Sequence, residues 1–154
     1  HGVGLQRATA PLANTMSEAE RNAAEIDIVE SIYRYLFENS ISYQRAKAPA
    51  YFLQFGDESD PPPGVIERFA GHKPPVRPVS DLKTLKFDKS ALPDGASIPG
   101  LIFIVRDIVW RPDGSVGAHG GYYEGFLSSA GNSCRLRRHA GEWVIVDWTE
   151  EWIS

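Results

Sequence analysis

The sequence predicts a single α+β domain in which an N-terminal helix packs in a curved antiparallel sheet. Three observations predict this fold: an amphipathic segment begins at Ser17, four β-rich segments follow residue 101, and short turns separate them. The length of 154 residues is typical of one domain, and a hydrophobic fraction of 42% is typical of a globular protein. We therefore expect one domain over residues 17–154, preceded by an extended arm over residues 1–16.

The segment after Ser17 has the start signal and the periodicity of an amphipathic helix. Ser17 is a favourable N-cap, and Glu20 follows at the spacing of a capping box. The helix should run to about Glu38, with apolar residues at i, i+3 and i+4 spacing. These residues are Ile26, Val29, Tyr33, Leu36 and Phe37, and the stripe is widened by Ile28, Ile32 and Tyr35. Such a wide stripe indicates that a sheet covers one side of the helix and other segments cover the rest.

The middle of the chain predicts a strand, a short helix and irregular structure. Residues 41–56 are typical of extended chain. Asp60 stands before three consecutive prolines and predicts the N-cap of a short helix over residues 64–70. The three prolines within residues 72–79 exclude helix there, and residues 80–100 are rich in turn formers.

Four β-rich segments fill the remainder of the chain. The segments are residues 101–110, 115–128, 133–138 and 143–153, and the turns between them are Pro112-Asp113-Gly114, Ala130-Gly131-Asn132 and Ala140-Gly141. Strands joined by short turns pair with their neighbours as an antiparallel meander. We expect this meander to curve around the N-terminal helix.

The same region carries a pattern of glycines and aromatic residues that resembles a known group of proteins. The pattern consists of Gly120-Gly121-Tyr122-Tyr123, Gly141-Glu142-Trp143-Val144-Ile145 and Trp152-Ile153-Ser154. It resembles small bacterial proteins of the NTF2-like or cystatin-like type, mainly over residues 100–154 and more weakly over residues 61–78. The resemblance implies a cone-shaped fold with a ligand pocket between the helix and the concave face of the sheet. It assigns no catalytic residue, because no catalytic motif of that superfamily is matched.

The strand predicted over residues 115–128 presents two different faces, because successive side chains of a strand point to opposite sides. One face carries Tyr122 and Glu124, and the other carries His119 and Tyr123. If the first face is buried, Glu124 is an acid in apolar surroundings and a candidate general acid or base. If the second face is buried, His119 and Tyr123 line the cavity. Glycines lie on both faces, so the sequence leaves the choice open.

Two charged residues, Arg106 and Asp107, interrupt the apolar run of the preceding strand. In a regular strand they point to opposite faces, so one of them faces the interior or lies near a strand end. An interior charge needs a partner, and the natural cross-strand pairs are Arg106 with Glu124 or Asp107 with His119. These pairs are either a polar group inside a ligand cavity or a purely structural ion pair.

The four tryptophans, Trp110, Trp143, Trp148 and Trp152, suggest either ligand stacking or packing on the sheet. By strand alternation, Trp143 and Trp148 should point to opposite faces, whereas Trp148 and Trp152 should share one. We favour packing for most of them and retain Trp110 as a candidate ligand contact.

Composition and motif content exclude several functions. The net charge of −4 gives no basic footprint for nucleic acid. The single cysteine, Cys134, can form neither an intramolecular disulfide nor a thiolate metal site by itself. The four histidines lack metal-ligand spacing, and no phosphate loop or Gly-x-Ser-x-Gly motif is present. No apolar run approaches the roughly 18 residues of a membrane span. We therefore expect no cofactor, no metal, no nucleic acid and no membrane partner.

The compartment depends on where the natural chain begins. Met16 followed by Ser-Glu-Ala-Glu is typical of a natural start, which would make the protein cytoplasmic. A processed terminus at His1 would instead indicate secretion. His1-Gly2 is similar to the terminus of copper-brace enzymes, but that site needs a second histidine on a suitable sandwich fold.

Three functional hypotheses follow. The first is a domain that binds a small apolar or mixed-polarity ligand between helix and sheet. The second is an enzyme of the same architecture, an isomerase, dehydratase or hydrolase, that uses a buried acid or base. The third is a module that forms a homodimer through its sheet face. The candidate catalytic residues are Glu124, Asp107 and His119, and the candidate ligand-binding residues are Arg106, Trp110, Tyr122 and Tyr123.

Overall fold

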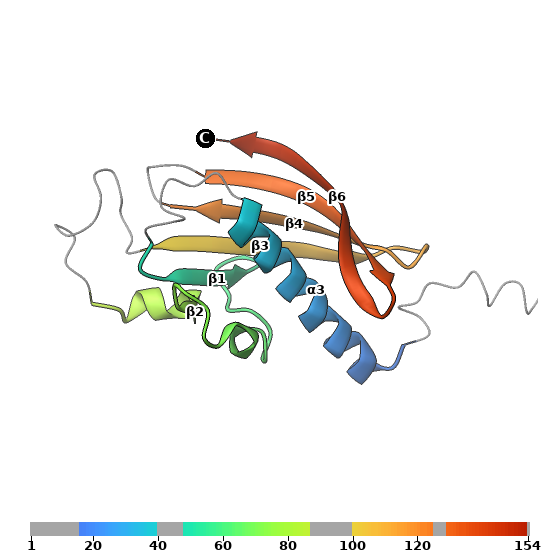
Figure 1. Cartoon of the computed structure of the whole chain (residues 1–154), viewed down its shortest axis with the longest axis horizontal. Coiled ribbons are helices and arrows are strands. Elements are labelled where there is room, and N and C mark those ends of the chain that lie inside the picture. The colour runs from blue at the N-terminus through green and yellow to red at the C-terminus, as the bar shows by residue number, and fades with distance from the viewer. Residues whose placement is uncertain (1–15, 40–47, 87–99, 125–128, 154) are drawn as a thin grey trace, which may run out of the picture.

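The computed structural model describes residues 16–39, 48–86, 100–124 and 129–153 and confirms the predicted α+β fold. One helix, α3 (Glu18–Asn39), lies obliquely across one face of a curved six-stranded sheet (Figure 1). We call this covered side the helix face of the sheet and the other side its outer face. The arm expected over residues 1–16 lies almost wholly outside the described residues.

Helix α3 begins as predicted. Ser17 Oγ accepts a hydrogen bond from the Glu20 backbone N–H at 3.1 Å, and the Ser17 N–H donates to Glu20 Oε1 at 3.3 Å, which completes a capping box. The buried residues of the helix are Ala24, Ile28, Val29, Ile32, Tyr33, Leu36 and Phe37. They form the stripe that packs on the sheet, so the amphipathic period set the orientation of the helix.

The sheet has the strand order β2-β1-β3-β4-β5-β6. Its strands are β1 (Tyr51–Phe55), β2 (Val76–Pro78), β3 (Leu101–Trp110), β4 (Val116–Tyr123), β5 (Ser129–His139) and β6 (Glu142–Ile153). Strands β3 to β6 form the predicted antiparallel meander. Strands β1 and β2 extend it in parallel pairing, so the whole sheet is mixed rather than purely antiparallel.

Two of the three predicted hairpin turns lie where the sequence placed them. The Pro-Asp-Gly turn closes with a hydrogen bond from the Gly114 N–H to the Arg111 carbonyl at 3.0 Å. The second connects β5 to β6 through Ala140 and Gly141, whose φ angles of 53° and 83° are those of a tight hairpin. The turn predicted at residues 130–132 is wrong, because these residues pair with β4 and β6 inside β5.

Asp60 does not cap the short helix that the sequence predicted. That helix is a 3₁₀ turn, η1 (Ile66–Phe69), without a side-chain cap. Asp60 instead accepts hydrogen bonds from the Ser80 N–H at 2.9 Å and the Ser80 hydroxyl at 2.6 Å, at the start of η2 (Val79–Lys83). Within the proline-rich segment, β2 pairs with β1, which places the segment at one edge of the sheet.

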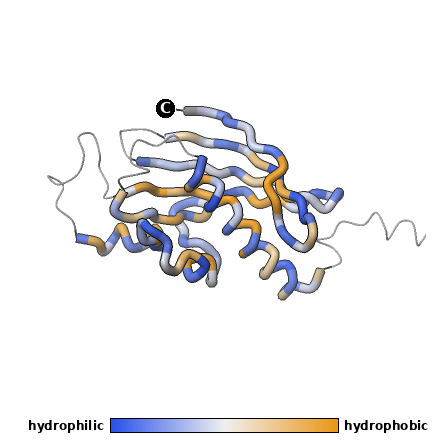
Figure 2. The backbone as a smooth tube through the Cα atoms, viewed as in Figure 1, coloured by the Kyte–Doolittle hydropathy of each residue, from blue (hydrophilic) through white to orange (hydrophobic). Residues whose placement is uncertain are grey.

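The core lies between α3 and the helix face of the sheet, where apolar residues of helix and strands meet (Figure 2). Gly120 permits a close approach of the helix, since a Cβ atom there would lie 3.2 Å from Ile32 Cγ2 and 3.4 Å from Leu36 Cδ1. Burial raises the pKa of the Cys134 thiol to about 12, so this side chain is a buried thiol and not an activated nucleophile.

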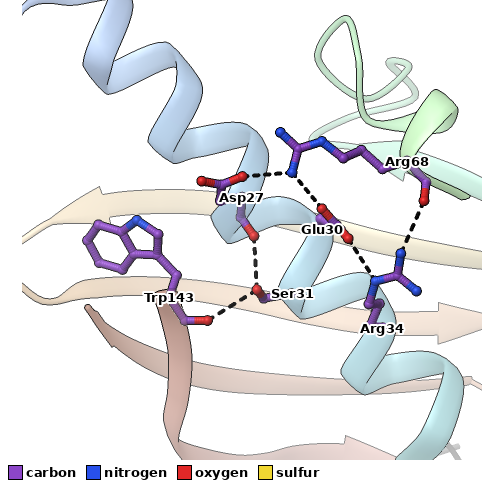
Figure 3. A network of polar contacts seen from close by, with 6 residues as sticks. All are labelled: Asp27, Glu30, Ser31, Arg34, Arg68 and Trp143. Carbon is purple, nitrogen blue, oxygen red and sulfur yellow. Dashed lines mark hydrogen bonds and ion pairs between the residues drawn. The ribbon is translucent and has the colours of Figure 1, made fainter. Parts of the chain in front are cut away.

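A polar network holds α3 against its neighbours (Figure 3). Arg68 of η1 donates to Asp27 at 2.7 Å and to Glu30 at 2.8 Å. Arg34 also donates to Glu30 at 2.8 Å and to the Arg68 carbonyl at 3.1 Å. Partial burial alone would raise the pKa of Glu30, but the hydrogen bonds from Arg34 and Arg68 outweigh it and lower the pKa. The network therefore joins helix and η1 through one shared carboxylate.

Candidate functional site

Two cavities lie on opposite faces of the sheet. The outer groove has a volume of about 390 Å³ and is lined by Gln54, Gly56, Asp57, Glu58, Ile102, Ile104, Arg106, His119, Gly120, Gly121, Tyr122, Tyr123, Ser129, Ala130, Gly131, Asn132, Glu151 and Trp152. The inner pocket has a volume of about 320 Å³ and is lined by Tyr35, Leu36, Asn39, Tyr122, Ala130, Asn132, Trp148 and Glu150. The inner pocket lies between α3 and the sheet, whereas the outer groove lies on the side without the helix.

The face of β4 that carries Tyr122 points toward the interior, and so does Glu124, which directly follows the strand. Tyr122 is 2% exposed and Glu124 is fully buried, whereas Tyr123 and His119 lie on the outer face. The alternation is regular because β4 pairs with β5 without a bulge. Glu124 is thus an interior acid, but it is not among the residues that line the two cavities. Its candidate role in catalysis stays a prediction.

Arg106 and Asp107 do not point to opposite faces. The pairing of β3 with β4 shifts between Arg106 and Val109, and Asp107 has a φ of 59°, so a bulge turns both charged side chains outward. Arg106 Nε lies 3.7 Å from Asp107 Oδ2. Of the two predicted pairs, Asp107 with His119 is confirmed by a 3.2 Å separation, whereas Arg106 lies across from His119 instead of beside Glu124.

His119 stands between two carboxylates in the outer groove. Its Nδ1 atom lies 3.2 Å from Asp107 Oδ2, and its Nε2 atom lies 3.4 Å from Glu151 Oε1. The Nδ1 atom is buried and makes no hydrogen bond of good geometry, so the contact with Asp107 is electrostatic. A protonated ring could interact favourably with both acids. This arrangement can hold or pass a proton.

Two facing glycines form part of the floor of the outer groove, and its rim is aromatic. Gly121 and Gly131 are direct partners across β4 and β5. A Cβ atom on Gly131 would lie 2.4 Å from Trp152 Nε1, so the indole rests directly on the strand backbone. Trp152 and Tyr123 are 47% and 38% exposed and flank this floor.

The inner pocket combines an aromatic wall with polar groups, among them Asn132 and Glu150. The rings of Tyr35 and Trp148 have centroids 4.4 Å apart. Asn132 is 8% exposed, lines the pocket, and makes no side-chain hydrogen bond within the described ranges. Glu150, across from Asn132 on β6, is exposed at the rim and likewise forms no ion pair there. The pocket therefore offers an amide and a carboxylate that neighbouring side chains do not use.

The tryptophans contradict the alternation expected for β6. In the register with β5, Val146 and Glu151 are extra residues, and each bulge reverses the side on which later side chains lie. Trp143 and Trp148 consequently share the helix face, whereas Trp152 lies on the outer face. Trp110 packs edge-on against Trp143 at 5.4 Å and donates to Glu25 at 3.3 Å, outside both cavities.

Sequence reasoning missed the residues that define the inner pocket, above all Asn132 and Glu150. Asn132 looked like part of a turn, although it stands in the alternating series Ala130, Asn132, Cys134 and Leu136, whose other members are apolar. That series is the signal that could have placed it on the helix face. Glu151 was missed because a bulge brings it to His119.

In the described part of the chain, no group of three or more His, Cys, Asp and Glu side chains is arranged to hold a metal ion. No helix within the described ranges is long and apolar enough to cross a membrane. Comparison with family models, with curated proteins and with solved structures found no match to this chain.

Proposed function

We propose that this protein binds a small organic molecule in the inner pocket between α3 and the sheet. The observation that carries the proposal is the Asn132 side chain, which is over nine-tenths buried and lacks a hydrogen-bond partner among described residues. The amide lines the pocket and makes no hydrogen bond to a described residue, so its oxygen and its N–H groups are available to a ligand.

The dimensions of the pocket support the same proposal. Its volume of about 320 Å³ falls at the lower end of the range of known small-molecule sites. Tyr35 and Trp148 supply a preformed apolar wall, and Asn132 and Glu150 supply the few polar groups that orient a ligand. The resemblance of residues 100–154 to NTF2-like proteins is consistent with a site between helix and sheet.

A fragment library screened by NMR tests this proposal. We expect binding fragments to shift the side-chain amide signals of Asn132 and the indole signal of Trp148. Asn132→Leu should abolish these shifts at Trp148, and the matched control Ser133→Ala, which changes the neighbouring residue on the outer face, should preserve them. Fragments that perturb only the indole signal of Trp152 would show that binding occurs in the outer groove, and this result would contradict the proposal.

A second candidate function is proton-transfer catalysis in the outer groove. It is favoured by the position of His119 between Asp107 and Glu151, at 3.2 and 3.4 Å. A base held in this way could remove a proton next to a carbonyl group. In D₂O, the protein should then accelerate α-proton exchange of simple ketones, and His119→Gln should abolish the acceleration. Exchange at the rate of buffer alone would remove this candidate.

The homodimer expected from the sequence stays a prediction. The outer face carries ion pairs, including Arg135 with Asp147 at 2.5 Å and Arg137 with Asp113 at 2.9 Å. A dimer formed through this face would have to bury or rearrange these charges, which is costly.

A further inference from the structure

The described lining of the inner pocket carries negative charge. Glu150 is the one charged side chain among the described residues that line the pocket. It is exposed at the rim and is not paired with any described basic side chain. Its carboxylate therefore remains available to a ligand and favours a cation over an anion.

The end of α3 adds to this negative potential. Leu36 and Asn39 line the pocket and belong to the last turn of the helix, whose carbonyl groups lack partners within the helix. The Asn39 side-chain amide donates to one of the nearby carbonyls, that of Tyr35, at 2.9 Å. No basic residue lies in the last turn to offset the negative end of the helix dipole.

The aromatic wall and Asn132 determine which cations fit. Tyr35 and Trp148 offer an aromatic surface on which the body of an organic cation can pack. The Asn132 amide oxygen accepts hydrogen bonds, and a cation with an N–H group can donate to it. A quaternary ammonium has no N–H to donate, so it would leave Asn132 without a partner.

We infer that the ligand of the inner pocket is a small primary or secondary ammonium compound with an aromatic or aliphatic body. The nitrogen lies between the Glu150 carboxylate and the Asn132 amide oxygen, and the body packs against Tyr35 and Trp148. This inference rests on the proposed function, because it names the class of ligand for the same pocket.

Isothermal titration calorimetry of the whole protein, which measures the affinity for each of four matched probes, tests the inference. The probes are 2-phenylethylammonium, the neutral 2-phenylethanol, the anionic 3-phenylpropionate and N,N,N-trimethyl-2-phenylethylammonium. We expect the primary ammonium to bind about tenfold more tightly than the alcohol, a difference of about 1.4 kcal/mol. The quaternary probe should bind more weakly than the primary ammonium, and the anion should bind least.

Two substitutions assign the preference to this pocket. Glu150→Gln should reduce the affinity for 2-phenylethylammonium about tenfold and leave the affinity for 2-phenylethanol unchanged. Glu142→Gln removes the same charge from the same strand, at an exposed position outside both cavities, and should change neither affinity. Circular dichroism of each variant verifies that the fold is retained.

The possible failures are distinguishable. Equal affinities for the ammonium and the alcohol, or equal losses in Glu150→Gln and Glu142→Gln, would overturn the ligand class and leave a binding pocket in place. Absence of binding by all four probes would also overturn the class. The proposed function itself fails only if the fragment screen finds nothing that perturbs Asn132 and Trp148.

Discussion

The two faces of the sheet treat their polar groups in opposite ways. On the outer face, charged side chains form ion pairs, as Arg135 does with Asp147 and Arg137 with Asp113. On the helix face, Asn132 is buried beside a cavity and lacks a partner within the described part of the chain. Polar groups that contact one another can serve structure alone, whereas a polar group that lines a cavity without a protein partner can hydrogen-bond to a ligand. This difference identifies the inner pocket as the stronger candidate for a binding site.

Replacing the buried amide should give the largest change in stability. In the absence of ligand, Asn132→Leu places an apolar side chain of similar volume at a position that is 8% exposed, so it should raise the free energy of unfolding by about 1–2 kcal/mol. Urea denaturation measures this change, with Ser133→Ala as the control. A loss of stability in Asn132→Leu would show that the amide is satisfied and would remove the contrast between the two faces.

Breaking the contact between Asp107 and His119 in the outer groove should have a smaller effect. The side chains of Asp107 and His119 are 59% and 38% exposed, so solvent screens their interaction. A double-mutant cycle with Asp107→Asn and His119→Gln should yield a coupling below about 1 kcal/mol. A larger coupling would mean that the two side chains form a strained or desolvated site, and it would favour the catalytic candidate over the binding pocket.

The smallest expected effect is a change in acid stability at the β3–β4 turn. Hydrogen bonds from the Ser115 hydroxyl and backbone N–H, together with Arg137, lower the pKa of Asp113 from 3.8 to about 2. Because the folded-state pKa is depressed, the stabilisation is complete above about pH 4 and is lost as the pH falls toward 2.

Asp113→Asn should therefore weaken the dependence of the melting temperature on pH between pH 2 and pH 4. The difference between the variant and the natural protein should be constant from pH 5 to pH 7. A difference that keeps growing above pH 5 would indicate that another group titrates with Asp113.

The sequence predicted the parts of the fold that depend on local interactions. The capping box at Ser17, the helical period and the hairpin at Gly141 each involve residues close together in the chain. Alternation also predicted that Glu124 shares a face with Tyr122, but not which face is buried. That choice depends on the helix packing across Gly120, a contact between distant segments.

The candidate site was harder to predict because three bulges change the faces of its side chains. One bulge turns Arg106 and Asp107 to the same side, a second at Val146 brings Trp148 to the face of Trp143, and a third at Glu151 separates Trp152 from Trp148. A bulge adds one residue to one strand without a distinctive sequence, so period-two reasoning fails beyond it. The pair of Asp107 with His119 was predicted because the two residues lie on neighbouring strands of one hairpin.

The two bulges of β6 also bear on how the protein behaves in crowded solution. Strand β6 is 12 residues long and forms one edge of the sheet (Figure 1). A long, flat, apolar edge would recruit strands from other molecules and promote aggregation. The bulges at Val146 and Glu151 interrupt the regular spacing of backbone groups, and Asp147 and Glu150 add charge beside them. The irregularity that assigns Trp148 and Trp152 to different faces thus also protects the exposed edge from intermolecular pairing.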